Sequence, residues 1–490
     1  MTRLSLKSMM TSRKTALAAG ALIIAAACTF NPATGRRQFS LIGEQQEIAM
    51  GKQYDKGVTA EFGLYPDEEL QKYVQDIGHR MAAVSERPNL PWQFKVVDDD
   101  TVNAFAVPGG FIYMTRGILA HFNSEAQLAT VMGHEIGHVT AKHSVEQISR
   151  AQLAQLGVGV AMVASEEFRK YSGLAELGLG ILFLKFSRDD ESQSDDLGMR
   201  YLVRTGYDPH EAPRVFEMLE RHGEVQGQAR LPEWQATHPS PDRRAARLTE
   251  VIQTLPPEQQ TGTIGRQTYL DRLDGMTFGK DPRQGYSVGS TFYHPDMAFR
   301  MDFPKDWKII NQRQLVAGVN SDQNAFVVLT LAQGKTPSEA EQAFFNQEGI
   351  TRGQQWRRGF RHFEVTPQVD AAGNSPPPIR GTVGFKAHEG QVFRMICYTS
   401  ADKMKTFSNQ MYRSLPSFKR LTDKRYLNVH AKKLKIAKLT RTMSLEQFNR
   451  QNPSTIELDA LAVLNGVEAS EVLPKGTLVK RIVGKDPPKN

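Results

Sequence analysis

The chain has 490 residues, and its 61 Lys and Arg against 53 Asp and Glu give a formal net charge of +8. The excess lies at the two ends: residues 1–27 carry +4 and residues 425–490 carry +6, which leaves about −2 for the rest. This length predicts two or three domains with sizeable cores. We expect no nucleic-acid partner, because the basic residues are not interleaved with aromatic side chains on which bases could stack.

Residues 1–27 have the pattern of an export signal. Four basic residues precede an apolar run from Ala16 to Ala27: Arg3, Lys7, Arg13 and Lys14. That run of about twelve residues is typical of a signal peptide and too short to span a membrane. We therefore expect the remainder of the chain to act outside the cytoplasm.

Cys28 directly follows Ala25-Ala26-Ala27, which suggests lipoprotein processing with Cys28 acylated as the new first residue. Ala25 stands where a bacterial lipobox usually has Leu, so the alternative is ordinary cleavage after Ala-x-Ala, which leaves a soluble periplasmic protein. Thr29 is not the Asp that retains lipoproteins at the inner membrane. A lipoprotein is therefore expected at the periplasmic side of the outer membrane.

The segment after the signal predicts two helices and a small sheet. Helices are expected over 43–62 and 66–86, and strands over Trp92–Val97, Asn103–Val107 and Phe111–Met114. In zinc proteases, an extended substrate pairs with a sheet edge beside the metal. The strand that begins at Asn103 is either such an edge or an ordinary core strand.

A metal-binding pattern lies in the run from Ser124 to His143. His134 and His138 are four residues apart, so on a helix they share a face and can offer two imidazole nitrogens to one ion. Glu135 lies beside that ion rather than on it, where a general base is needed. The alternative is a chance match on a core helix.

A zinc hydrolase needs a third protein ligand. His143 points about 140° away from His138 on an ideal helix and cannot join the same ion. A later helix, which Ser187 can cap, supplies Glu191 and Asp195 on one face. Glu191 can ligate zinc, while Asp195 can hydrogen-bond the second ring nitrogen of a ligand histidine. The alternative is an acidic, solvated helix start.

Two apolar, Gly-rich stretches, 153–164 and 173–186, separate these helices. Each has about 12 to 14 residues, below the ~20 that a membrane span needs. We expect a helical hairpin that is buried or surface-active, and we favour an ordinary core hairpin.

The rest of the chain predicts a linker and a second domain. Helices are expected over 209–223 and 241–254, followed by a turn-rich linker, 256–288. Residues 289–420 alternate strands and helices and read as an α+β domain of unknown role. Its histidines show no metal-site spacing: His294, His362 and His388. Cys397 is expected to be a small buried hydrophobe, because with Cys28 alone it makes no disulfide framework.

Residues 425–490 predict a strand, two helices and a second strand. This order, with Leu464-Asn465-Gly466 and the turn at Pro474–Leu478, resembles a LysM-type glycan-binding module. The resemblance implies peptidoglycan as a partner, and the net positive charge suits an anionic envelope surface. The alternative is a small packing domain whose lysines keep it soluble.

Three motifs resemble the HtpX and CAAX-prenyl-protease family of gluzincin metalloproteases, and its soluble bacterial branch of beta-barrel assembly-enhancing proteases most of all. They are HEIGHVTAKH from His134, SRDDESQSD from Ser187 and THPSPDRRAARL from Thr237. The resemblance covers about residues 40–255.

This resemblance implies a role for most of the candidate site residues. It implies one Zn²⁺ per chain, held by His134, His138 and Glu191, with Glu135 as catalytic base. Asp195 matches the Asp that follows the family's ligand Glu. Residues Asn103, Ala104 and Phe105 would form the substrate-binding edge strand, and Arg244 matches the Arg that follows the family's His-Pro motif.

His238 lies in the Thr237-His238-Pro239 segment, where two functional roles are open. It could donate a hydrogen bond to the oxyanion that forms during peptide hydrolysis. Alternatively, it could occupy the fourth position on zinc and hold the enzyme latent, since a neutral imidazole is a good zinc ligand. The alternative to both is a surface-loop histidine.

These patterns together predict a multidomain α+β protein. A mostly α-helical zincin protease domain with a small β-sheet, 28–255, is followed by the α+β domain and the LysM-like module. The predicted function is a zinc endopeptidase of the bacterial cell envelope that hydrolyses misfolded or misassembled envelope proteins. The alternative is a chaperone or scaffold lipoprotein of outer-membrane assembly with a latent zinc site.

Overall fold

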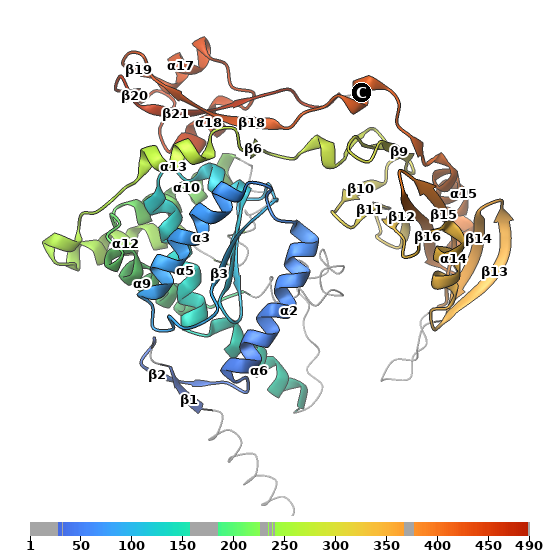
Figure 1. The fold of residues 1–490 in the computed structure, drawn as a ribbon, viewed down its shortest axis with the longest axis horizontal. Coiled ribbons are helices and arrows are strands. Elements are labelled where there is room, and N and C mark those ends of the chain that lie inside the picture. The colour runs from blue at the N-terminus through green and yellow to red at the C-terminus, as the bar shows by residue number, and fades with distance from the viewer. Residues whose placement is uncertain are drawn as a thin grey trace, which may run out of the picture. The chain divides into compact units, whose positions relative to one another are not determined.

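The computed structural model describes residues 28–31, 33–156, 185–225, 234, 238, 241–366 and 377–488. The chain divides into two compact units, each treated below by itself (Figure 1). Unit 1 runs to Phe278 and also includes Lys433–Val483, whereas unit 2 holds Gly279–Lys432 together with Gly484–Asn490. The multidomain α+β class predicted from sequence is confirmed.

Two predictions concern segments that the structure leaves undescribed. The signal, 1–27, and most of the two apolar stretches between the zinc-binding helices lie outside the described residues. Among the helices that are described, none combines the length and apolar character that a membrane span requires.

Unit 1 opens with a hairpin and a three-stranded sheet. The hairpin pairs β1 (Cys28–Asn31) with β2 (Arg36–Phe39). The sheet has the order β3-β5-β4, with β3 (Gln93–Val97) parallel and β4 (Ala104–Val107) antiparallel to the central β5 (Phe111–Thr115). Among the described residues, strand β4 therefore lies at an edge of this sheet, which is one of the two alternatives that the sequence left open.

Helices make up most of unit 1 (Figure 1). They are α2 (Glu44–Phe62), α3 (Glu68–Ala83), α4 (Arg116–His121), α5 (Glu125–Thr140), α6 (His143–Leu156), α9 (Arg188–Arg204), α10 (Glu211–Val225), α12 (Pro241–Thr254) and α13 (Arg266–Leu273). Helix α5 packs against α3, α9 and α10. All of its residues after Glu125 are buried, so it forms the centre of the unit.

Glycines bring α5 and α9 close together. A side chain at Gly133 would lie 3.0 Å from the backbone oxygen of Gly198, and one at Gly137 would lie 2.9 Å from that of Ser194. The Ser124 hydroxyl caps α5 by accepting from the Gln127 amide. Because only glycine permits this approach, side chains on facing turns of α5 and α9 meet directly.

Residues 433–483 complete the core of unit 1. They have the predicted order of strand β18 (Lys432–Lys438), helices α17 (Leu445–Gln451) and α18 (Leu458–Asn465), and strand β21 (Leu478–Val483). Strand β18 pairs with β21 and with the short strand β6 (Thr277–Phe278). Apolar side chains of this segment lie in the same buried cluster as those of α3 and α5.

Lys480 joins this segment to the end of helix α4. Its side chain is 0% exposed, and Nζ donates to the carbonyl oxygens of Ala120 at 2.7 Å, Phe122 at 2.6 Å and Leu464 at 2.9 Å. Burial, and then the charge of Arg266, lower the pKa of Lys480 well below its usual value. The three acceptors match the three N–H groups of an ammonium, and the carbonyls of Ala120 and Phe122 lie at the C-terminal end of α4, where a cation is favoured.

The segment predicted as a linker, 256–288, differs in the structure. Its helix α13 buries Tyr269, Leu270 and Leu273 completely in the core of unit 1. The turn signals at Pro256-Pro257 and Gly279 are present, but the apolar face of α13 between them packs against the core of unit 1. Unit 1 therefore extends beyond the predicted boundary at 255, to Phe278.

Unit 2 contains a seven-stranded antiparallel sheet in the order β10-β11-β12-β16-β15-β14-β13 and a four-stranded sheet in the order β17-β9-β8-β7. The strands of the large sheet are β10 (Lys308–Asn311), β11 (Leu315–Val319), β12 (Ala325–Leu331), β13 (Ile350–Arg357), β14 (Phe360–Val365), β15 (Ile379–His388) and β16 (Gln391–Ser400). The smaller sheet consists of β7 (Tyr286–Val288), β8 (Thr291–His294), β9 (Phe299–Asp302) and β17 (Lys419–Arg420).

The two longer helices of unit 2 cover opposite faces of the large sheet. Cys397 on β16 packs in the cluster under α15 (Met404–Ser414), while its neighbour Ile396 packs in the cluster under α14 (Pro337–Phe345). Successive strand residues point to opposite faces, which explains the division. Burial raises the pKa of the Cys397 thiol to about 12, so the prediction of a buried, inert cysteine is confirmed.

Candidate metal centre

Helix α5 presents the two histidines of the HExxH pattern on one face. The Nε2 atoms of His134 and His138 lie 3.0 Å apart, and both residues are 2% exposed. Burial, followed by the nearby charge of Arg244, lowers the pKa of His134 to about 3, so its imidazole is neutral. A neutral imidazole is the form that binds a metal.

Helix α9 brings Glu191 to the same point. Its Oε1 lies 3.4 Å from His138 Nε2 and its Oε2 lies 3.6 Å from His134 Nε2. Asp195, one turn further along α9, places Oδ1 2.9 Å from His134 Nδ1. The structure therefore brings Glu191 to the metal-binding side of His134 and Asp195 to the opposite ring nitrogen, as the spacing predicted.

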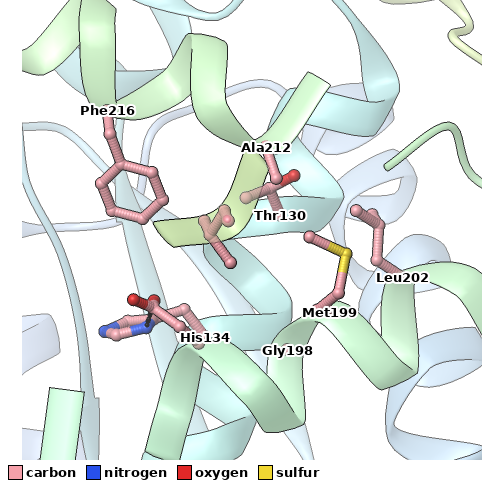
Figure 2. Close-up of a pocket in the computed structure, with 9 residues that line it drawn as sticks. Thr130, His134, Gly198, Met199, Leu202, Ala212 and Phe216 are labelled. Atoms are coloured by element: carbon pink, nitrogen blue, oxygen red, sulfur yellow. Dashed lines mark hydrogen bonds and ion pairs between the residues drawn. The ribbon is translucent and has the colours of Figure 1, made fainter. Parts of the chain in front are cut away.

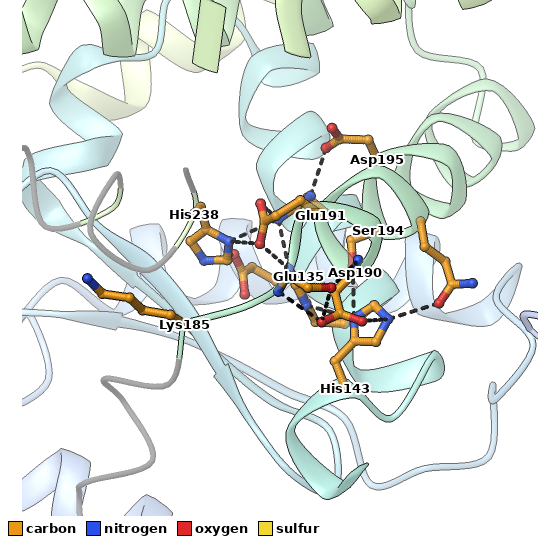
Figure 3. Close-up of polar contacts among 12 residues, drawn as sticks. Glu135, His143, Lys185, Asp190, Glu191, Ser194, Asp195 and His238 are labelled. Atoms are coloured by element: carbon orange, nitrogen blue, oxygen red, sulfur yellow. Dashed lines mark hydrogen bonds and ion pairs between the residues drawn. The ribbon is translucent and has the colours of Figure 1, made fainter. Parts of the chain in front are cut away.

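His238 adds a fourth possible ligand. Its Nδ1 lies 2.8 Å from Glu191 Oε1 and 3.3 Å from His134 Nε2 (Figure 3). The residue is 2% exposed, and its ring stacks on Trp234 with centroids 4.7 Å apart. The alternative of an exposed surface-loop histidine is therefore wrong.

The four residues fit a zinc ion. One ligand atom from each of His134, His138, Glu191 and His238 can be chosen so that all lie within 4.8 Å of one another, and this is the metal-binding group found among the described residues. Zinc bonds of ~2.0–2.2 Å in a tetrahedron place ligand atoms roughly 3.3–3.6 Å apart. Neighbouring atoms here are 2.8–3.6 Å apart, so three imidazoles and a carboxylate surround a volume of the right size.

Arg244 supports the carboxylates of the centre. Its guanidinium donates to both carboxylate oxygens of Asp195, at 2.9 and 2.6 Å, and Nη1 lies 2.7 Å from Glu191 Oε2. The group is stacked on Phe216, 4.3 Å from the ring centroid. Burial alone would raise the pKa of Asp195, but the charge of Arg244 and the contact with His134 lower it to about 2.

These contacts correct the predicted role of Arg244. Resemblance placed it among substrate-binding residues, but it is only 6% exposed and its donors face Asp195 and Glu191. A buried bidentate pair of this kind positions the carboxylates and leaves the guanidinium unable to reach a substrate. Arg244 is therefore a positioning residue in this structure.

Glu135 lies beside the four-residue group. It is 1% exposed, and its Oε1 is 3.7 Å from His238 Nε2. Burial first, and the charge of Glu191 as well, raise its pKa to about 7 against the opposing effect of His138. The backbone amide of Ala106 on β4 hydrogen-bonds its carboxylate, so the sheet edge and the carboxylate are direct neighbours.

The predicted substrate strand lies at this edge. Ala104 and Phe105 belong to β4, which pairs with β5 on one side only. Asn103 directly precedes the strand, and its carbonyl oxygen accepts from the amide of Thr115. Phe105 stacks on Tyr113 with centroids 5.0 Å apart, which fixes the strand against the sheet.

Sequence analysis missed a role for His143. The residue starts α6 and is 2% exposed, and its Nδ1 lies 2.9 Å from Nδ1 of His138. Burial, and then the neighbouring His138, lower the pKa of His143 to about 4. The sequence signal for this role is that His143 follows His138 by five residues. An ideal helical wheel, however, places His143 on a different face of the helix from His138.

A small pocket lies on the other side of His134, toward α10. Apolar side chains line most of it (Figure 2): Met199, Leu202, Ala212, Phe216 and Leu248. His134 and Asp195 form its polar wall. The ligand histidine is thus held between an apolar surface and the metal-binding group.

Because the third candidate ligand is a glutamate on a separate helix, the centre falls in the gluzincin class of zinc hydrolases. The part of the chain that builds it, residues 68–252, matches the model of Peptidase family M48.

Curated relatives match the same part of the chain. The mitochondrial metalloendopeptidase OMA1 of Arabidopsis thaliana is 32% identical over 235 residues, which cover 46% of this chain and 47% of that protein. The beta-barrel assembly-enhancing protease of Yersinia pestis is 29% identical over 261 residues, 51% of this chain and 52% of that protein. Its Escherichia coli (strain K12) counterpart is 29% identical over 227 residues, 44% and 45%. The chain spans about half the length of these relatives.

Proposed function

We propose that the protein is a zinc endopeptidase of the bacterial cell envelope that hydrolyses misfolded or misassembled envelope proteins. The observation that carries the proposal is the convergence of His134, His138 and Glu191 on one point, with Glu135 beside it. Two relatives are named for enhancing beta-barrel assembly, which supports envelope proteins as substrates.

Each part of the site has a task in peptide hydrolysis. Bound zinc would polarise the peptide carbonyl and activate the attacking water. Glu135 takes the proton from that water and delivers it to the leaving nitrogen. The free edge of β4 pairs with the extended substrate through main-chain hydrogen bonds, which requires an unfolded segment and no particular sequence.

The test is zinc analysis combined with digestion of an unfolded model protein. We expect one zinc per chain, loss of cleavage after chelation and recovery when zinc is returned. Full cleavage by a chelated, zinc-free protein would overturn the proposal. The scaffold alternative instead requires zinc binding without any cleavage, in the native chain and in variants that open the site.

We also propose that His238 blocks the site at rest. Four protein ligands leave no open position on a tetrahedral zinc, whereas a catalytic zinc keeps one. His238 comes from a segment outside the peptidase helices α5 and α9, so its withdrawal would open the fourth position without disturbing the other ligands. Such a latch would restrain a protease that acts among other envelope proteins.

Replacing His238 by Ala should raise basal cleavage, by a factor set by how much of the population is blocked. The competing role, a donor to the oxyanion, predicts a rate lower by about 10²–10³. The measurement is the initial rate on an unfolded protein at fixed zinc, with zinc content determined in parallel. His294→Ala in unit 2 is the matched control, and a slower or unchanged His238→Ala enzyme would exclude the latch.

We propose that the protein is a lipoprotein anchored at Cys28 on the periplasmic side of the outer membrane. Intact-mass spectrometry of membrane-extracted protein should show a chain that begins at Cys28 and carries acyl groups. An unmodified mass from Cys28 would leave the soluble periplasmic alternative.

Peptidoglycan remains a proposed partner of the segment 425–490. The supporting observation is the strand–helix–helix–strand order of the LysM-like pattern. Co-sedimentation of the full chain with purified peptidoglycan tests it, and a chain that stays in the supernatant would exclude it.

A further inference from the structure

We propose that His143 is a positioning residue that fixes the tautomer and orientation of the zinc ligand His138. Three further contacts hold His143 itself: its Nε2 lies 2.9 Å from Gln193 Oε1 and 3.6 Å from Asp190 Oδ1, and the Ser194 hydroxyl lies 3.4 Å from its Nδ1 (Figure 3). The inference rests on the zinc site proposed above and assigns a role that the ligand set alone does not include.

Proton accounting gives the direction of each hydrogen bond. His138 directs Nε2 at the metal-binding group, and a nitrogen that binds a metal carries no proton. Its proton therefore sits on Nδ1, which must donate. The atom it faces is His143 Nδ1, at 2.9 Å, so that nitrogen must be the acceptor.

The same reasoning extends one residue further. A neutral His143 that accepts at Nδ1 carries its proton on Nε2. That nitrogen faces the side-chain oxygen of Gln193 at 2.9 Å, which accepts. The three side chains thus form a hydrogen-bonded chain from His138 through His143 to Gln193, with one donor and one acceptor at each step.

A bend in the backbone makes this contact possible. Between the end of α5 at Thr140 and the start of α6 at His143, Lys142 adopts the left-handed conformation with φ of 60°. On a continuous helix, His143 would point about 140° away from His138. The left-handed residue redirects the chain, so His143 turns back onto His138. Backbone strain of this kind, at a residue that is not glycine, persists where the surroundings require it.

The two ligand histidines have different partners. His134 is held by the Asp195 carboxylate, whereas His138 is held by a neutral imidazole. A second carboxylate at that position would add another buried negative charge beside Glu135 and Glu191. Because uncompensated buried charges are costly, a neutral partner orients His138 without that penalty.

The experiment compares zinc affinities by competition with a chelator of known affinity. In His143→Leu the Nδ1–H of His138 loses its acceptor, and we expect the zinc dissociation constant to rise by about 10–100-fold. His143→Gln offers an amide oxygen in its place and should recover part of the loss. His121→Leu, which removes another buried histidine that is outside the metal-binding group, should keep the native zinc affinity.

Folding and positioning are separated by measuring the zinc-free proteins. The proposal requires thermal unfolding of zinc-free His143→Leu to stay close to that of the native zinc-free chain. If this variant fails to fold, Gln193→Met tests the outer link, because Gln193 is partly exposed and its loss should weaken zinc binding by a smaller factor. Native zinc affinity in a folded His143→Leu, or in Gln193→Met, would overturn the proposal. A native chain without zinc affinity would overturn the proposed function as well.

Discussion

Glu135→Gln is expected to lower the rate of proteolysis by at least 10²-fold while keeping one zinc per chain. The carboxylate is outside the four-residue ligand group, so an amide of the same size leaves the metal ligands in place. An amide cannot accept the proton of the attacking water, and general-base catalysis contributes about 10²–10⁴ to a rate. The measurements are zinc content and the initial rate of cleavage of an unfolded protein.

A double variant separates the proposed blocking role of His238 from the role of Glu135 as general base. Glu135→Gln combined with His238→Ala should have an open site and still be inactive, whereas His238→Ala alone should be faster than native. A double variant that cleaves at the rate of His238→Ala would show that Glu135 is not the base. Loss of zinc from Glu135→Gln would place this carboxylate among the ligands and contradict its assigned role.

Lys480→Ala is expected to destabilise unit 1 by about 3 kcal/mol, although Lys480 is far from the metal centre in sequence. The substitution removes the donor that three buried carbonyl oxygens share, those of Ala120, Phe122 and Leu464, and only Leu464 keeps a further donor, the Asn123 side-chain amide at 3.3 Å. A buried acceptor that loses its partner costs about 1–3 kcal/mol of stability. Water that enters the vacated space recovers part of the loss summed over these carbonyl oxygens. Calorimetry measures the effect as a lower unfolding temperature.

Added zinc identifies which thermal transition is the unfolding of unit 1, because a ligand that binds only the folded unit raises its unfolding temperature. Lys438→Ala, on the exposed part of β18, is the matched control and should stay within about 0.5 kcal/mol of native. If Lys480→Ala lowered the unfolding temperature no more than the control does, residues 433–483 would contribute nothing to the core of unit 1 through this contact.

Local spacing predicted the metal centre well. The four-residue periods of His134/His138 and Glu191/Asp195 survive folding because both helices are regular and capped by Ser124 and Ser187. Gly133 and Gly137 on α5, with Gly198 on α9, allow the two helices to approach closely. The spacing of residues along the sequence does not predict this close approach.

Contacts that depend on an irregular backbone were not predictable in the same way. An ideal helical wheel excluded His143 from the surroundings of His138, because nothing in the residue type of Lys142 announces a left-handed conformation. The hairpin β8–β9 likewise turns through Pro295-Asp296 to Ala298, a residue that is not glycine and yet has φ of 49°.

Burial against distant parts of the chain was the second feature that the sequence did not predict. Lys480 lies in a basic segment whose lysines, in the packing-domain alternative, would keep it soluble, yet it is completely buried. Arg244 was assigned to substrate from its place after a His-Pro motif, whereas its partners lie on α9, 49 residues earlier. In both cases the deciding partner comes from a distant part of the chain.

The bond from Lys480 to Ala120 closes a loop of 360 residues. A chain that crosses a membrane from its N-terminus delivers α4 and α5 long before β21, and Gly279–Lys432 of unit 2 pass in between. The peptidase unit therefore lacks part of its core until the last segment has arrived. Under the proposed export and proteolytic activity, timing of this kind would keep the enzyme from reaching its finished form while its own chain is still unfolded and open to cleavage.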